Sequence, residues 1–143
     1  MQLHDAFVGT WKLRSCYHDM ADGKRFYPFG NNAHGLLVYT AEGYMSGALT
    51  ATNRKKFTSR ELFGGTPEEQ ASAMGSYLHY AGKYEVKTDH ILHHVEMSLF
   101  PNWVGTTQKR YYTFEKNLLT LSSGPFIANG ISQNAFLLWE KIT

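Results

Sequence analysis

The sequence predicts a mainly β protein, a single antiparallel barrel of about eight strands with one helix. Most of the 143-residue chain alternates short apolar runs with turn signals of Gly, Pro, Asn and Asp, a pattern typical of barrels and sandwiches. Only residues 66–82 carry a full set of helix signals. Eight strands suffice to close a barrel whose interior holds either side chains or one small ligand.

The composition is that of one folded domain spanning residues 1–143. Hydrophobic residues make up 43% of the chain and charged residues 18%, which is typical of a globular protein and not of a disordered one. A chain of this length buries about two thirds of its unfolded surface without staples. Aromatic residues, at 15%, supply core area and ring surfaces for a ligand.

Charge, cysteine content and the N-terminal sequence narrow the class further. A net charge of +2 with scattered basic residues argues against nucleic acid as a partner. The single cysteine, Cys16, excludes a disulfide framework and a Cys-based zinc site within one chain. No signal peptide and no apolar run of membrane-span length is found. We therefore expect a cytoplasmic protein with no membrane partner; a homodimer stays open.

Three strands are predicted in the first half of the chain. Residues 9–18, "GTWKLRSCYH", alternate in character and precede an Asp22-Gly23 turn. Residues 35–40 and 43–49 are two further strands joined by a short turn. Strict alternation places two sets of side chains on opposite faces of the first strand: Trp11, Leu13, Ser15 and Tyr17 on one, and Lys12, Arg14, Cys16 and His18 on the other.

A helix is predicted over about residues 66–80. Thr66 suits the cap position, Pro67 suits the first helical position, and Glu69 completes a capping box. Gly82 is suited to end the helix. The apolar stripe of this helix consists of Ala71, Met74, Tyr77 and Leu78.

Strands resume after the helix and carry the candidate site. The predicted strands cover residues 83–87, 91–99, 107–114, 117–123 and 135–142. In the strand 91–99, apolarity alone turns inward the face that holds Ile91, His93, Val95, Met97 and Leu99. The opposite assignment turns His94 and Glu96 into the barrel together, about 7 Å apart by the strand rise, which suits an acid–base pair. Both assignments stay open.

The next strand adds polar groups to the candidate site. Gln108, Arg110 and Tyr112 share one face of the strand 107–114. If Glu96 lies beside Arg110, a charge pair forms that fixes a polar ligand group inside the barrel or lies on a solvated face outside it. We take His93, His94, Glu96 and Arg110 as candidate catalytic residues. The candidate ligand-binding residues are Tyr39, Tyr44, Trp103, Gln108 and Tyr112.

Other kinds of site are disfavoured by the residue patterns. His90, His94 and Glu96 could share a face, but a flat strand spreads side chains that a metal needs convergent. The "GGTPEE" segment before the helix is better explained by capping than by anion binding. Cys16 has no identifiable base beside it. We expect neither a metal nor a cofactor.

Several segments of the chain resemble a known family. "GTW" in the first strand and "LWEKI" in the last resemble the ends of a calycin barrel, and "FYPFG", "GLLVYTAEGYMS", "YAGKYEV" and "HHVEMSLFPNWVGT" resemble the lipocalin-like domain family of small bacterial and fungal proteins. Lipocalins place an arginine from the end of the barrel over the Trp of this motif; here the last strand offers Glu140 and Lys141 instead.

The resemblance implies a small hydrophobic or aromatic molecule in the barrel. Some lipocalin-like proteins of natural-product pathways act as cofactor-free cyclases or isomerases, which implies acid–base chemistry on a polyketide-like compound. A carrier or sensor with the same pocket and no turnover is the second hypothesis. The third is a structural barrel filled by its own side chains.

Overall fold

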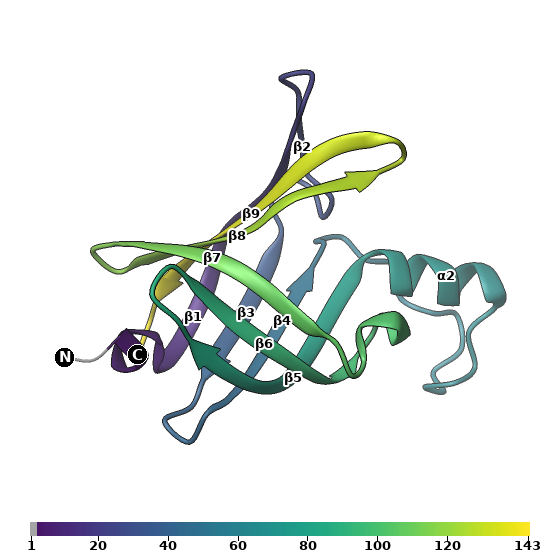
Figure 1. Cartoon of the computed structure of the whole chain (residues 1–143). Helices are drawn as coiled ribbons and strands as arrows, with labels where there is room; N and C mark the ends of the chain where they lie inside the picture. The colour runs from purple at the N-terminus through teal and green to yellow at the C-terminus, as the bar shows by residue number, and fades with distance from the viewer. Residues whose placement is uncertain (1–2) are drawn as a thin grey trace.

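The computed structural model describes residues 3–143, and its strands close into an antiparallel barrel (Figure 1). The mainly β fold and the single helix of more than two turns are confirmed. The strands are β1 (Gly9–Met20), β2 (Arg25–Phe26), β3 (His34–Tyr39), β4 (Tyr44–Thr50), β5 (Tyr77–Val86), β6 (His90–Ser98), β7 (Thr107–Glu115), β8 (Leu118–Ala128) and β9 (Ile131–Lys141). The sheet order is β2-β1-β3-β4-β5-β6-β7-β8-β9, and pairing of β1 with β9 closes the barrel.

Three helical segments accompany the strands in the described part of the chain. They are α1 (Leu3–Phe7), α2 (Pro67–Gly75) and the 3-10 turn η1 (Pro101–Trp103). In Figure 1, α1 lies at one end of the barrel beside the C-terminus, and α2 lies toward the opposite end. Within residues 3–143, none of these helices has the length and apolarity needed to cross a membrane.

The predicted start of the long helix is confirmed and its predicted end is wrong. The Thr66 hydroxyl accepts from the Glu69 amide at 3.1 Å, and the Glu69 carboxylate accepts from the Thr66 amide at 2.9 Å. The helix ends at Gly75, and Tyr77 already begins β5. No α2 residue is buried, so packing adds little to the stability of the helix. Beyond Gly75, residues 77–83 pair with β4 instead of continuing the helix.

Gly82, which was expected to end the helix, lies instead inside β5. It sits at a bulge between β5 and β6, where Ala81 pairs with Met97 and Gly82 pairs with Val95. A side chain here would collide with the His94 carbonyl. Glycine is therefore required because the two backbones approach closely at the bulge.

A second bulge, in β1, corrects the predicted faces of the first strand. Leu13 pairs with Trp139 and Ser15 pairs with Leu138, so one extra residue is inserted in β1. An extra residue reverses the alternation of every side chain after it. Trp11 and Leu13 are buried, and beyond the bulge it is Cys16, predicted on the opposite face, that is buried with them, at 4% exposure.

The end of the barrel beside α1 is filled by side chains. Phe7 is fully buried and packs edge-on against Tyr39, Tyr112 and Phe114. The Trp11 indole N–H donates to the Phe7 carbonyl oxygen at 2.9 Å. These contacts make α1 a plug, because helix and barrel share both apolar area and a hydrogen bond.

Lysine takes the position over Trp11 that the family pattern gives to arginine. The Lys141 Nζ atom lies 5.5 Å from the centroid of the Trp11 ring. That geometry is a cation–π contact. Lysine therefore replaces the arginine of the family pattern, and a cation still lies over the Trp11 ring.

Candidate functional site

The other part of the barrel interior is hollow. It encloses a cavity of about 680 Å³, a size typical of sites for small organic ligands. Its wall is mostly apolar and includes Leu37, Met45, Leu49, Leu121, Leu137 and Trp139. Pro28 and Phe29, which follow β2, and Phe126 from β8 also line it. The hypothesis of a barrel filled throughout by its own side chains is thereby disfavoured.

His93 is the polar centre of this wall. It points inward from β6, is 2% exposed, and lines the cavity. Its Nε2 lies 2.7 Å from the Tyr39 hydroxyl and its Nδ1 lies 2.6 Å from the Tyr80 hydroxyl. Burial, together with the positive charge of Arg110, lowers the pKa of His93 to about 3. The imidazole is therefore neutral, with one nitrogen donating and the other accepting.

The buried position of Tyr39 indicates which nitrogen of His93 carries the hydrogen. Tyr39 is 1% exposed, and within residues 3–143 its hydroxyl has His93 as its hydrogen-bond partner. If Tyr39 donates to Nε2, its hydrogen is satisfied; the reverse arrangement strands a buried O–H. Nδ1–H then donates to the Tyr80 oxygen. This leaves the Tyr80 O–H, in the cavity wall, free to donate to a ligand.

Arg110 brings a positive charge to the same place. It lines the cavity, and its guanidinium donates to the Lys109 carbonyl at 3.0 Å and to the Gln108 side chain at 3.3 Å. Burial raises the pKa of the Tyr80 hydroxyl, and the charge and hydrogen-bonding capacity of Arg110 oppose that rise. Among the described residues, Arg110 forms no ion pair with a carboxylate.

A second imidazole lines the cavity from β1. His18 Nδ1 lies 3.0 Å from the Gln133 side-chain oxygen, and the Gln133 amide nitrogen donates to the Ala128 carbonyl. Because the Gln133 oxygen can only accept, His18 Nδ1 carries the hydrogen in this bond. The other ring nitrogen, Nε2, makes no hydrogen bond to the described residues.

The structure places four of the predicted site residues in the cavity wall. His93, Trp103, Gln108 and Arg110 all line it. Trp103 comes from η1 and packs edge-on against Tyr80 and Phe100. Gln108 faces His93 across the β6–β7 ladder.

The three predicted tyrosines lie elsewhere. Tyr39 is buried behind His93. Tyr44 is on the surface, 47% exposed. The Tyr112 hydroxyl donates to the carbonyl oxygens of Lys87 and Thr88 at the plugged end, where its ring packs on Phe7. Of the three, Tyr39 alone is joined to the cavity, through His93.

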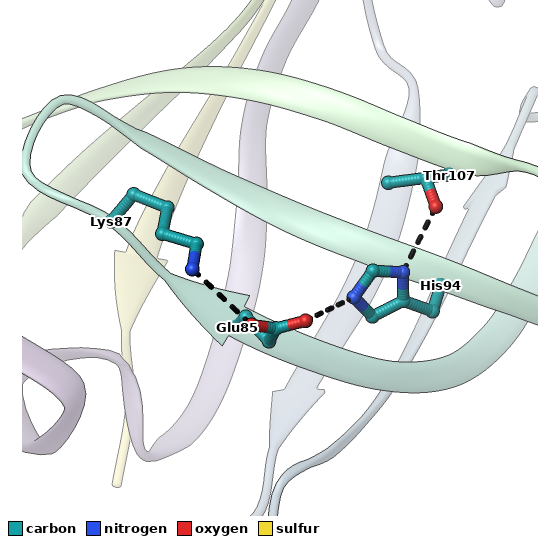
Figure 2. Close-up of polar contacts among 4 residues, drawn as sticks. All are labelled: Glu85, Lys87, His94 and Thr107. Carbon is teal, nitrogen blue, oxygen red and sulfur yellow. Dashed lines mark hydrogen bonds and ion pairs between the residues drawn. The ribbon is translucent and has the colours of Figure 1, made fainter.

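His94 and Glu96 are on the outside of the barrel, so the inward assignment of this pair is wrong. His94 Nε2 lies 2.6 Å from the Glu85 carboxylate and Nδ1 lies 2.9 Å from the Thr107 hydroxyl, while Lys87 contacts Glu85 from the other side (Figure 2). Hydrogen bonds from His94 and Lys87 lower the pKa of Glu85. The hydrogen-bonded series Thr107–His94–Glu85 resembles a hydrolytic triad, but these residues lie on the outer sheet face and do not line the barrel cavity.

Glu96 does not meet Arg110. It is exposed at the bulge opposite Gly82, and Arg110 pairs with Ile91 in the β6–β7 ladder. The same bulge turns Met97 outward, to 60% exposure, although alternation predicted it inward. Within residues 3–143, no group of His, Cys, Asp or Glu side chains is placed to hold a metal ion.

Sequence patterns do not reveal the cavity role of Cys16 and His18. They also do not reveal the contact of the Tyr80 hydroxyl with His93, because the predicted helix 66–80 includes Tyr80, which lies in β5. Cys16 and His18 were assigned to the face opposite Trp11, and the β1 bulge brings both to the cavity. The inward position of these residues depends on how β1 pairs with β9. Local sequence patterns do not predict that pairing.

The barrel and its partly polar cavity are those of a lipocalin-like protein. The family model for the lipocalin-like domain matches residues 8–142, and the chain belongs to this family. A curated relative, the 4'-hydroxy-3'-methoxypropiophenone carrier protein ppsC of Aspergillus oryzae, is 37% identical over 107 residues, covering 68% of this chain and 96% of the relative. No solved structure matches the chain significantly. The fold and this relative support binding of a small molecule.

Proposed function

We propose that this protein is a carrier for a small aromatic carbonyl compound, held in the barrel cavity without turnover. The observation that carries the proposal is a cavity of about 680 Å³ with mostly apolar walls and a polar cluster formed by Tyr80, His93 and Arg110. An apolar body with a few convergent polar groups is the usual form of such a site. The name of the curated relative, a carrier of an aryl ketone, agrees with it.

The wall chemistry favours a flat ligand with oxygen at one end. Trp103 and Phe29 offer ring surface, while Leu49 and Leu121 offer aliphatic surface. The Tyr80 O–H and the Arg110 guanidinium are donors that suit a ligand oxygen. These donors then fix the orientation of the ligand, and burial of the ligand's apolar surface supplies most of the affinity.

Ligand titration with 4'-hydroxy-3'-methoxypropiophenone tests the proposal. Trp103 and Trp139 line the cavity, so binding should quench tryptophan fluorescence saturably. Gly47→Val should weaken binding at least tenfold, because its new side chain enters the cavity, where the Leu37 side chain lies 3.2 Å from the added Cβ.

Ala48→Val is the matched control for this substitution. Ala48 neighbours Gly47 in β4 and is absent from the cavity lining, so here the valine side chain lies outside the barrel interior. Affinity should stay within twofold of the wild type. Equal losses in both variants, or no saturable quenching in the wild-type protein, would count against the carrier proposal.

A cofactor-independent isomerase or cyclase is the second candidate, supported by the orientation of His18. Its Nδ1–H is held by Gln133, which leaves Nε2 as a proton acceptor in the cavity wall. In this scheme Nε2 removes the proton next to the ligand carbonyl, the C–H electron pair becomes the enolate double bond, and Tyr80 and Arg110 stabilise the enolate oxygen. The proton returns at another position.

The residues first considered for proton transfer are less suitable. His94 and Glu96 lie outside the cavity. His93 has both nitrogens hydrogen-bonded to tyrosines and a pKa of about 3, so it is a poor base near neutral pH. These placements favour the carrier over the enzyme.

Hydrogen exchange separates carrier from enzyme without knowledge of the true substrate. In D₂O, an enzyme should accelerate deuterium incorporation beside the carbonyl of bound 4'-hydroxy-3'-methoxypropiophenone, as followed by NMR. His18→Asn should abolish that acceleration, and Arg110→Lys should reduce it. A carrier should leave the exchange rate at the buffer value while binding the ligand.

A further inference from the structure

We infer that the cavity binds its ligand as an oxyanion, the conjugate base of a weakly acidic phenol or enol, with the charge held at Arg110. This inference rests on the proposed small-molecule site and specifies the chemical class of its ligand. The class is an aromatic or enolic hydroxyl conjugated with a carbonyl group, which delocalises the charge once the proton has left.

The cavity wall is cationic and contains no carboxylate within the part of the chain described. Besides Arg110, its titratable side chains are Cys16 and His18 from β1, Tyr80 from β5, His93 from β6 and Lys109 from β7. Burial raises the pKa of the Cys16 thiol to about 11, so this group stays neutral. Lys109 places its Nζ atom 4.9 Å from the centroid of the Tyr111 ring.

Arg110 is partly exposed, and within residues 3–143 no carboxylate neutralises its charge. Its two hydrogen-bonded acceptors, the Lys109 carbonyl and the Gln108 amide oxygen, are neutral. A guanidinium in a partly apolar wall is stabilised far better by an anion than by neutral acceptors. His93 cannot supply that anion, because it is neutral and sits between two hydroxyls.

The donors around Arg110 suit one oxyanion. The Tyr80 oxygen accepts from His93 Nδ1–H, so its own O–H is the group left for a ligand. Arg110 lines the same cavity wall as Tyr80 and His93, and it donates to Gln108, the residue paired with His93 across the β6–β7 ladder. Its charge therefore lies beside this hydrogen-bonded chain. A ligand oxygen there would receive a phenolic O–H and a guanidinium N–H, which both favour the charged form.

A bound-state titration tests the inference with two probes. 4'-Hydroxy-3'-methoxypropiophenone changes its absorption spectrum when its phenol ionises, and its O-methyl ether cannot ionise. We expect the protein to lower the pKa of the bound phenol by at least about one unit, the usual effect of one adjacent opposite charge. The phenolate would then bind at least about tenfold more tightly than the phenol. The ether should bind with an affinity independent of pH across the same range.

Variants assign the effect to Arg110. Arg110→Gln should remove the pKa shift of the bound phenol, and Arg110→Lys should retain part of it, because lysine keeps the charge without the planar fork. Arg14→Gln is the matched control: Arg14 lies on the outer face in an ion pair with Glu140 at 3.2 Å, and the shift should persist at its wild-type size.

The outcomes distinguish this inference from the proposed function. If both probes bind and the phenol keeps or raises its pKa, the oxyanion inference is overturned and the carrier proposal stands. A shift that survives in Arg110→Gln overturns the assignment to Arg110. If neither probe binds saturably at any pH, the carrier proposal and the inference built on it both fail.

Discussion

The two ends of the barrel interior are built from similar residues, but one end is packed and the other encloses a cavity. At the plugged end, Phe7 fills the space between Tyr39, Tyr112 and Phe114. At the other end, aromatic and aliphatic side chains line a cavity of about 680 Å³. The difference lies in what enters the interior: the plugged end receives a helix from the same chain. One barrel can thus secure its stability at one end and leave the other end free for a ligand.

A chain of contacts joins the two ends. Phe7 packs on Tyr39, Tyr39 is hydrogen-bonded to His93, and His93 is hydrogen-bonded to Tyr80 in the cavity wall. His93 is therefore the boundary between packed core and ligand site. Its neutral imidazole is the hydrogen-bond partner of the buried Tyr39 hydroxyl and of the Tyr80 hydroxyl at the cavity wall, a role that an apolar residue cannot fill.

The largest expected effect is loss of the plug. Phe7→Ala should destabilise the protein by about 3–5 kcal/mol, as truncations of fully buried aromatic residues do, because Phe7 is completely buried. Urea unfolding measures the change. Leu3→Ala in the same helix is the control: Leu3 is 51% exposed, so its loss should be small. Equal effects from both would contradict the role given to Phe7.

Replacing His93 should lower the unfolding free energy by less than Phe7→Ala does. His93→Phe leaves the buried hydroxyls of Tyr39 and Tyr80 without their imidazole partner, and we expect a loss of about 1–3 kcal/mol in unfolding free energy. Tyr39→Phe removes one hydroxyl and should cost less than His93→Phe. If the two variants unfold at the same urea concentration as the wild type, the hydrogen-bonded chain contributes nothing to stability.

The same histidine predicts a pH dependence. The pKa of His93 is lowered from its ordinary value of 6.5 to about 3 in the folded protein. Between pH 3 and pH 6.5, His93 is therefore protonated in the unfolded chain and neutral in the native state. Stability should be complete above pH 6.5 and fall as the pH is lowered toward 3, by at most about 1.4 kcal/mol per pH unit from this group. His93→Phe should lack this contribution. Parallel stability–pH curves for the two proteins would refute it.

The comparison of the two ends also explains what the sequence could predict. The capping box of Thr66 and Glu69 follows from a local pattern, because it depends on neighbours in the chain. Local alternation defines the two faces of the strand that holds His93 but leaves open which face is inward; the structure turns the His93 face inward. The plug formed by α1 and the bulges at Ser15 and Gly82 depend on partner strands and on space inside a closed barrel. Those bulges decide that His18 lines the cavity and that Met97 does not.

The smallest expected effect is on the outer face of β6. Glu96→Gln changes an exposed side chain at the bulge, and His94→Ala removes the contacts with Glu85 and Thr107 (Figure 2). Neither residue lines the cavity, so ligand affinity and any ligand hydrogen exchange should equal the wild-type values.

Fluorescence titration and NMR on the same samples measure both quantities, with Arg110→Gln as the variant that should alter binding of the ionised phenol. A tenfold change in either quantity in Glu96→Gln would place the functional surface outside the barrel. It would also contradict the assignment of ligand binding to the cavity and of a purely structural role to the outer face of β6. Unchanged values would mean that the two adjacent histidines of β6 differ in role because they lie on opposite faces of one strand.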